Sequence, residues 1–115
     1  MFDGTPKEVE IYARPGGQSP YTEWLESLRD RQARLRIETR VARLRGGNPG
    51  DCKAVGAGVF ELRIDYGPGY RLYLAVAEQT LVVLLLGGDK TTQAQDIQTA
   101  RQYWAEYQQR RASDG

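Results

Sequence analysis

The sequence predicts an α+β domain with a small antiparallel sheet, and three observations lead to this prediction. Residues 59–66 and 70–77 alternate between apolar and polar side chains around a Gly-Pro-Gly turn at 67–69, which is typical of a β-hairpin. Residues 81–86 are apolar throughout, as in a central strand covered on both faces. Apolar residues recur at helical spacing on either side of this region. The expected order is therefore β-α-α-β-β-β-α.

The predicted hairpin has one apolar face and one polar face, because successive side chains of a strand alternate. A three-residue turn would place Asp65 opposite Arg71 and Arg63 opposite Tyr73 on the polar face. The apolar side chains of both strands would then lie together on the other face. A cross-strand ion pair between Asp65 and Arg71 is thus the structural alternative to a functional role for Arg71.

The segment before the hairpin is expected to form one strand and two helices. Residues 7–13 alternate in part and predict an edge strand. Ser19 followed by Pro20 is typical of a helix start, and Asp30 suits the N-cap of a second helix. The expected buried stripe of this second helix consists of Ala33, Ile37, Val41 and Leu44. The Gly-Gly-Asn-Pro-Gly run at 46–50 ends the helix.

The remaining segments complete a single domain that spans residues 1–115. Residues 51–57 are expected to form a loop that leads into the sheet. Thr92 and Gln95 match the spacing of a capping box at the start of a final helix. The apolar face of that helix consists of Ile97, Ala100, Trp104 and Tyr107. Residues 110–115 are expected to be a frayed polar tail.

The composition excludes several classes of site and indicates a cytoplasmic protein. The 16 basic and 15 acidic residues give a net charge of +1, so only a local patch could attract nucleic acid. The absence of histidine removes the commonest general base and metal ligand, and we expect no metal or cofactor. A single cysteine, Cys52, fits a reducing compartment. Residues 1–10 lack the apolar run of a signal peptide, and residues 81–86 are too few to span a membrane.

Three strings in the sequence carry a resemblance to a known superfamily. They are Phe-Glu-Leu-Arg at 60–63, Gly-Tyr-Arg-Leu-Tyr at 69–73, and Leu-Leu-Gly-Gly-Asp-Lys-Thr-Thr-Gln at 85–93. In this order and spacing they resemble the RelE/ParE superfamily of bacterial toxins, and most closely its HigB-like branch, the addiction module killer proteins. The resemblance covers nearly the whole chain. It implies a small sheet with two helices packed on one side and a terminal helix.

The resemblance implies the toxin of a type II toxin–antitoxin pair. Such a toxin would be a ribosome-dependent mRNA endonuclease that inhibits translation. Its implied partners are a cognate helix-turn-helix antitoxin, the ribosome and mRNA, with operator DNA contacted only through the antitoxin. One alternative is a ParE-like gyrase inhibitor that cleaves nothing. Another is a degenerate relative that only binds the antitoxin, which the acidic residues Glu61 and Asp65 favour because RelE is basic there.

Metal-independent RNA cleavage needs a proton acceptor for the 2′-hydroxyl, a proton donor for the leaving oxygen, and cations that stabilise the phosphorane. Arginine suits the last role through its bidentate fork. The candidate catalytic residues are Arg71, Arg63, Lys90, Glu61 and Tyr73. By resemblance, the three basic residues match functional positions of RelE-like toxins, and Arg71 is the principal candidate.

The proton-transfer groups are left open by the sequence. The base could be Glu61 or Asp89, and the acid could be Lys90 or Tyr73. Glu61 could instead be a salt-bridge partner of Arg63, and Tyr73 could stack on an RNA base.

The arginine-rich second helix is a further candidate surface. Residues predicted to bind RNA are Arg34, Arg40, Arg43 and Lys53. Contacts of this kind with phosphates would add salt-dependent affinity. The alternative is a solvated helix with pairs such as Arg34 with Glu38.

Overall fold

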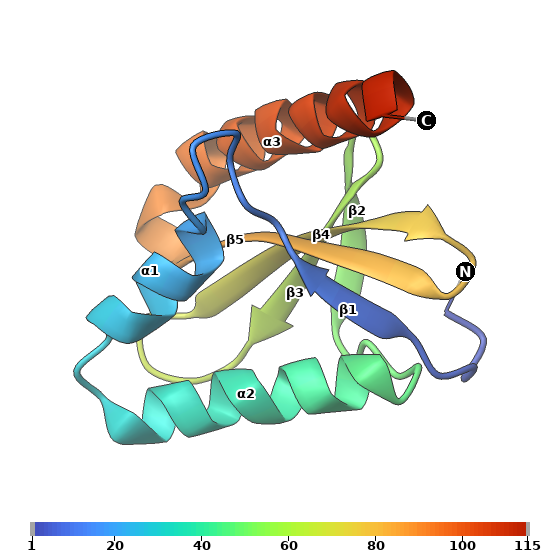
Figure 1. The fold of residues 1–115 in the computed structure, drawn as a ribbon. Coiled ribbons are helices and arrows are strands. Elements are labelled where there is room, and N and C mark those ends of the chain that lie inside the picture. Colours follow the sequence, from blue (N-terminus) through green and yellow to red (C-terminus); the bar gives the residue numbers. More distant parts are fainter. Residues whose placement is uncertain (1, 115) are drawn as a thin grey trace.

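The computed structural model describes residues 2–114, which form a five-stranded sheet with helices on both faces (Figure 1). The elements in chain order are β1 (Glu8–Ile11), α1 (Pro20–Ser27), α2 (Arg31–Arg45), β2 (Cys52–Gly56), β3 (Val59–Ile64), β4 (Tyr70–Glu78), β5 (Leu81–Gly88), the 3₁₀ helix η1 (Lys90–Thr92) and α3 (Gln93–Asp114). The α+β class is therefore confirmed, with one strand more than expected.

The sheet has the strand order β1-β5-β4-β3-β2 and is mixed. β1 pairs with β5 in parallel, whereas the other three pairings are antiparallel. The expectation of a purely antiparallel sheet is thus wrong for β1. Two helices and three strands separate β1 from β5 in the chain, and so long a connection permits parallel pairing. The predicted edge position of β1 and interior position of β5 are confirmed.

The predicted loop at 51–57 instead contains the edge strand β2. β2 pairs antiparallel with β3, and Gly56, Ala57 and Gly58, with positive φ angles, form the turn between them. The exposed Lys53 and Ala54 give the strand little apolar alternation. The sequence pattern missed β2 because its partly buried residues, Cys52 and Val55, lie three positions apart and so do not alternate as strand residues usually do.

The predicted register of the β3–β4 hairpin is wrong by two residues. Arg63 faces Arg71 and Glu61 faces Tyr73, because β3 ends at Ile64 and five residues form the turn. Asp65 therefore lies outside the ladder and does not face Arg71. A shift of two residues leaves every side chain on its predicted face.

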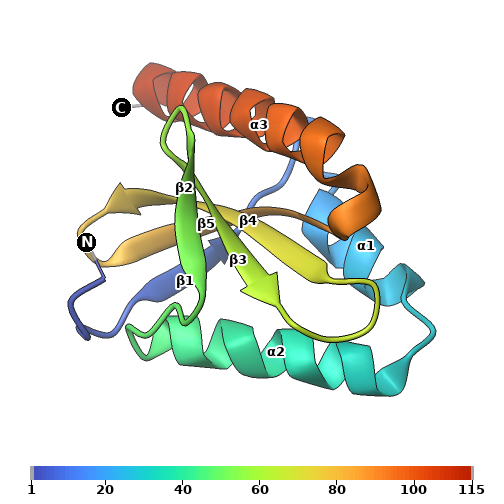
Figure 2. The ribbon, with the colours of Figure 1, turned by 180° about the vertical axis from the view of Figure 1, so that it is seen from behind.

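Helices lie on both faces of the sheet (Figures 1 and 2), and each face has its own hydrophobic core. α1 and α2 cover one face, where the predicted stripe of α2 is buried together with Leu62 and Leu72. α3 covers the other face, where Trp104 and Tyr107 pack near Tyr73. Alternate residues of β5 enter opposite cores, which confirms that this strand is covered on both faces.

The helix starts follow the sequence in α1 and α2 but not in α3. Ser19 caps α1 and Asp30 caps α2, as predicted. The capping box predicted at Thr92 and Gln95 lies one turn earlier, between Asp89 and Thr92, where it begins η1. α3 then continues to Asp114, so the expected frayed tail is helical as far as the structure describes it. Within residues 2–114, no helix combines the length and apolarity needed to cross a membrane.

The end of β5 has no room for side chains on either face. A Cβ atom at Gly87 would overlap the indole ring of Trp24 from α1, and one at Gly88 would overlap the Asp96 carboxylate from α3. Trp24 is itself held edge-on against Tyr70, with ring centroids 6.0 Å apart. Both helices can therefore approach the strand only because its last two residues are glycines.

We predict that Gly87→Ala lowers the free energy of unfolding by about 1–3 kcal/mol, because the added methyl group overpacks the site beside Trp24. Urea denaturation measures this change. The matched control is Gly16→Ala, whose Cβ would have no neighbour within 4 Å. Equal stability of the two variants would show that Trp24 moves aside freely.

Candidate functional site

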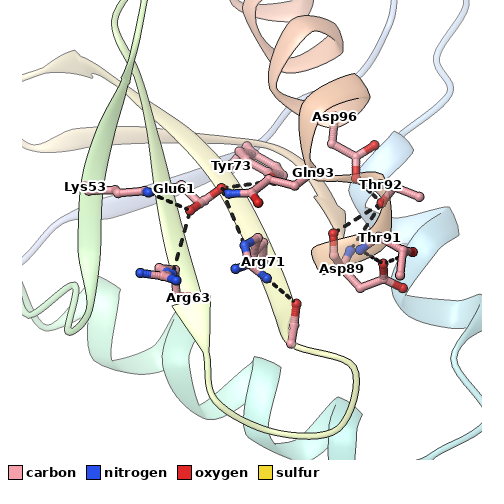
Figure 3. Close-up of polar contacts among 11 residues, drawn as sticks. Lys53, Glu61, Arg63, Arg71, Tyr73, Asp89, Thr91, Thr92, Gln93 and Asp96 are labelled. Atoms are coloured by element: carbon pink, nitrogen blue, oxygen red, sulfur yellow. Dashed lines mark hydrogen bonds and ion pairs between the residues drawn. The ribbon is translucent and has the colours of Figure 1, made fainter.

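A buried carboxylate lies at the centre of the polar cluster on the α3 face of the sheet (Figure 3). Glu61 of β3 is 0% exposed. Its Oε2 accepts hydrogen bonds from Gln93 Nε2 at 2.8 Å and from the Tyr73 hydroxyl group at 3.3 Å. Gln93 is the first residue of α3 and Tyr73 belongs to β4. The carboxylate thus joins the sheet to the start of the terminal helix.

Three cations from three different strands surround Glu61 (Figure 3). Arg71 Nε lies 3.6 Å from Oε2, while Lys53 Nζ and Arg63 Nε lie 3.9 and 4.0 Å from Oε1. The Arg71 side chain is 6% exposed, whereas those of Lys53 and Arg63 are about half exposed. The carboxylate offsets the mutual repulsion of the three cations, which would otherwise push them apart.

The ion pairs leave buried polar atoms without a hydrogen bond. Within the described residues, neither Glu61 Oε1 nor Arg71 Nε has a hydrogen-bond partner, although both are buried. Arg71 Nη1 donates a 2.7 Å hydrogen bond to the Gly69 carbonyl group. Among the hydrogen bonds of the described residues, none is donated by Arg71 Nη2.

Arg63, Arg71 and Lys90 line one pocket of about 330 Å³. Arg71 faces Gly88 across the β4–β5 ladder, and Lys90 follows two residues later in η1. This pairing brings the lysine to the side of the hairpin that carries the arginines. The three basic residues, which were expected to converge if the last strand ended beside the polar face, thus line the same pocket.

The acid–base candidates divide into buried and exposed groups. Glu61 and Tyr73 are both 0% exposed, and burial, followed by the charge of Glu61, raises the pKa of Tyr73 well above its ordinary value. Asp89 Oδ1 accepts hydrogen bonds from the Thr91 backbone and hydroxyl groups, so its carboxylate caps η1. Lys90 alone of these four candidates is exposed and lines the pocket.

Three contributors to the site were not found from the sequence. The exposed residues Asp51 and Asp65 line the pocket, and Gln93 holds Glu61. Asp65 had been paired with Arg71 in the wrong register, and Asp51 precedes the unpredicted strand β2. Gln93 gave no signal beyond its place in the last of the three strings.

The chain is similar in sequence to a protein family and to a bacterial protein. Residues 23–105, more than two thirds of the chain, match the family model described as "Phage derived protein Gp49-like (DUF891)". The chain belongs to this Gp49-like family. A protein of Haemophilus influenzae, described only as uncharacterized, is 49% identical over 81 residues, which cover 70% of this chain and 82% of that protein. The family match contains the whole polar cluster, from Lys53 to Gln93.

Of the four predicted RNA-binding residues of the Gp49-like chain, three belong to α2 and Lys53 belongs to β2. Lys53 belongs to the Glu61 cluster. Arg40 donates hydrogen bonds to the carbonyl groups of Arg63, Pro49 and Asp51, so it fastens α2 to the loop before β2. Arg34 is partly covered and Arg43 is exposed, and neither forms an ion pair with the described residues. The pair considered between Arg34 and Glu38 is therefore not formed.

The cluster has the composition of an anion site. Among residues 2–114, no three histidine, cysteine, aspartate or glutamate side chains lie close enough together to hold a metal ion. The pocket is lined by three basic and two acidic residues. A phosphate group could bind there to the basic side chains.

We predict that the protein loses stability as the pH rises from about 10 to about 12, and that Tyr73→Phe reduces this loss. A phenol whose pKa is raised by folding stabilises the fold below the ordinary value of 10.0, and this contribution disappears at higher pH. Urea denaturation across the range measures the slope. Tyr103→Phe is the control, since the Tyr103 hydroxyl group has no hydrogen bond to the described residues. Identical slopes for wild type and Tyr73→Phe would contradict the assignment.

Proposed function

We propose that this Gp49-like protein is the toxin of a toxin–antitoxin pair and that it cleaves mRNA on the ribosome. The family is associated with toxin–antitoxin systems related to RelE. The observation that carries the proposal is the pocket where Arg63, Arg71 and Lys90 meet beside the buried Glu61. The resemblance to RelE/ParE toxins of the HigB-like branch supports it through the same three residues.

The substrate group that suits this pocket is a phosphodiester. Arg71 is held in place by Gly69 and Glu61, and its Nη2 is left to bind one phosphate oxygen. Arg63 and Lys90 supply further positive charge from the exposed rim. Cations that are fixed before the reaction need little reorganisation when charge develops on the phosphorane. Stabilisation of that charge is the main contribution we assign to the site.

The proposed reaction is attack by the RNA 2′-oxygen on the adjacent phosphorus. The 2′-hydroxyl proton passes to a carboxylate, and the candidates that line the pocket are Asp51 and Asp65. The bond from phosphorus to the 5′-oxygen breaks, and Lys90 donates a proton to that leaving oxygen. The products are a 2′,3′-cyclic phosphate and a 5′-hydroxyl end. Glu61 and Tyr73 are assigned no direct proton transfer, because both are buried.

Glu61 is assigned a positioning role in this scheme. It is the one carboxylate that lies within 4.0 Å of Lys53, Arg63 and Arg71 together among the described residues. Its negative charge offsets the repulsion among these cations, two of which, Arg63 and Arg71, line the pocket. Gln93 and Tyr73 in turn fix the carboxylate.

We predict that Arg71→Gln reduces cleavage at least about a hundredfold, since one preorganised cation is lost from the phosphorane. Transcriptome-wide mapping of new mRNA 5′ ends, shortly after induction without antitoxin, measures this. Ends in phase with codons should appear for the wild type and for the control Arg29→Gln, an exposed arginine outside the pocket. Undiminished cleavage by a normally expressed Arg71→Gln protein would remove the assignment.

A second candidate function, inhibition of gyrase without RNA cleavage, is supported by the burial of Glu61 and Tyr73. A site of this composition could bind a protein or nucleic-acid surface through its cations alone. The same experiment separates the two functions. Cells that stop growing and show DNA damage, but no new mRNA ends, would favour the gyrase inhibitor.

We predict that Glu61→Gln slows cleavage by about ten- to a hundredfold without weakening RNA binding, because the cations shift while the net charge becomes more positive. The pH–rate profile distinguishes positioning from proton transfer. If Glu61 only positions the cations, the Glu61→Gln protein should keep the fall in cleavage rate at low pH that the wild type shows. Loss of that limb in Glu61→Gln would make Glu61 the general base and contradict its assigned role.

A further inference from the structure

The exposed face of α2 has an apolar residue in an unusual setting. Leu35 is 58% exposed and is the only large hydrophobic residue so exposed among residues 2–114. On one side of it lies a groove of about 430 Å³ between α2 and the end of β3, which we call the α2 groove. This groove is lined by Gln32, Leu35, Arg36, Thr39, Arg40, Arg43, Ile64 and Asp65. A smaller hollow of about 190 Å³ lies on the other side of Leu35.

The surroundings of Leu35 are strongly basic. The arginines that line the two hollows are Arg31, Arg34, Arg36, Arg40 and Arg43. None of them is in an ion pair with the described residues. The Arg36 guanidinium group stacks on the Tyr66 ring at 4.5 Å, which fixes its direction. The acidic residues of the two hollows are Asp65 and Glu38, so positive charge remains uncompensated.

This combination fits an acidic polypeptide better than a nucleic-acid backbone. Phosphate groups would pair with the arginines but would leave Leu35 in contact with a charged, hydrated chain. An acidic segment with an apolar side chain would match both features. Its carboxylates would pair with the arginines, and its apolar side chain would cover Leu35 and Ile64.

We propose that the α2 groove binds an acidic segment of the antitoxin and takes up one of its apolar side chains. This inference rests on the proposed function, which requires an antitoxin. Ile64 and Asp65 line both the α2 groove and the pocket that contains Arg71, so the two sites share one wall. Arg40, at the floor of the groove, also bonds to the Arg63 carbonyl group. A segment bound in the groove would therefore lie directly beside the entrance to the RNA site.

The test uses three probes on the full chain: a synthetic glutamate-rich peptide with leucine at every fourth position, the same peptide with serine in place of leucine, and a single-stranded oligoribonucleotide. Amide chemical shifts locate each probe, and fluorescence anisotropy gives its affinity. The variants are Leu35→Ser and Arg43→Gln, both at exposed positions. Arg14→Gln is the charge-matched control, because Arg14 packs near Tyr103 on the α3 side.

We expect the leucine peptide to shift resonances of α2 and Ile64, and Leu35→Ser and Arg43→Gln each to weaken it about tenfold. Arg14→Gln should bind like the wild type. Equal binding of the serine peptide would overturn the proposal, since charge alone would explain it. Failure of the leucine peptide to bind, or oligoribonucleotide binding confined to α2, would overturn it as well.

The failure of this inference is distinguishable from the failure of the proposed function. Leu35 lies outside the Arg71 pocket, so Leu35→Ser should keep the cleavage activity of the wild type. An Arg71→Gln protein that still cleaves mRNA would challenge the catalytic assignment while leaving peptide binding in the α2 groove intact. If the leucine peptide does not bind and cleavage is unchanged, only the proposal for the α2 groove is contradicted.

Discussion

The burial of the Glu61 carboxylate is the constraint on which the polar half of the molecule depends. An ionised carboxylate taken out of water is costly unless charges and hydrogen-bond donors compensate it. The donors come from β4 and α3, and the cations come from β2, β3 and β4. Each of these elements must therefore be in place before the carboxylate can be buried. The polar cluster can therefore form only when these elements are packed together.

The sequence predicted which face each side chain of the hairpin takes, but not which side chains meet across it. Alternation is a property of one strand and survives a register error of two residues, as Leu62 and Leu72 show. The pairing depends on the length of the turn, and Gly67-Pro68-Gly69 suggested three residues where the chain uses five. The acidic partner of Arg71 is therefore Glu61, and not Asp65 as the predicted register implied.

Burial of polar residues was the second limit of sequence reasoning. Glu61 and Tyr73 lie on the predicted polar face of the hairpin, but both are fully buried. α3 covers that part of the sheet, however, and nothing in the local pattern of β3 reports where a helix 30 residues later will lie. Arg63, Arg71 and Lys90, which line one pocket, were singled out because their strings keep a recognisable order. The strand β2 was missed because its partly buried residues, Cys52 and Val55, give no regular alternation.

The arginines illustrate how one residue type serves different physical purposes in a small protein. Arg40 satisfies three backbone carbonyl groups that would otherwise need water. Arg71 is nearly buried against a carboxylate. Arg43 is exposed and without an ion-pair partner among the described residues. The number of arginines in a segment therefore does not predict how many are free to bind a partner, because an arginine such as Arg40 is already bonded to backbone carbonyl groups.

At Gly87 and Gly88, the end of β5 has no side chain on either face of the sheet. Trp24 on one face and Asp96 on the other are separated there by two residues without side chains. Lys90 lies two residues beyond Gly88, at the start of η1, and lines the pocket together with Arg71. A partner that displaced α1 from the far face would therefore remove the Trp24 contact at Gly87, three residues before Lys90, without entering the pocket.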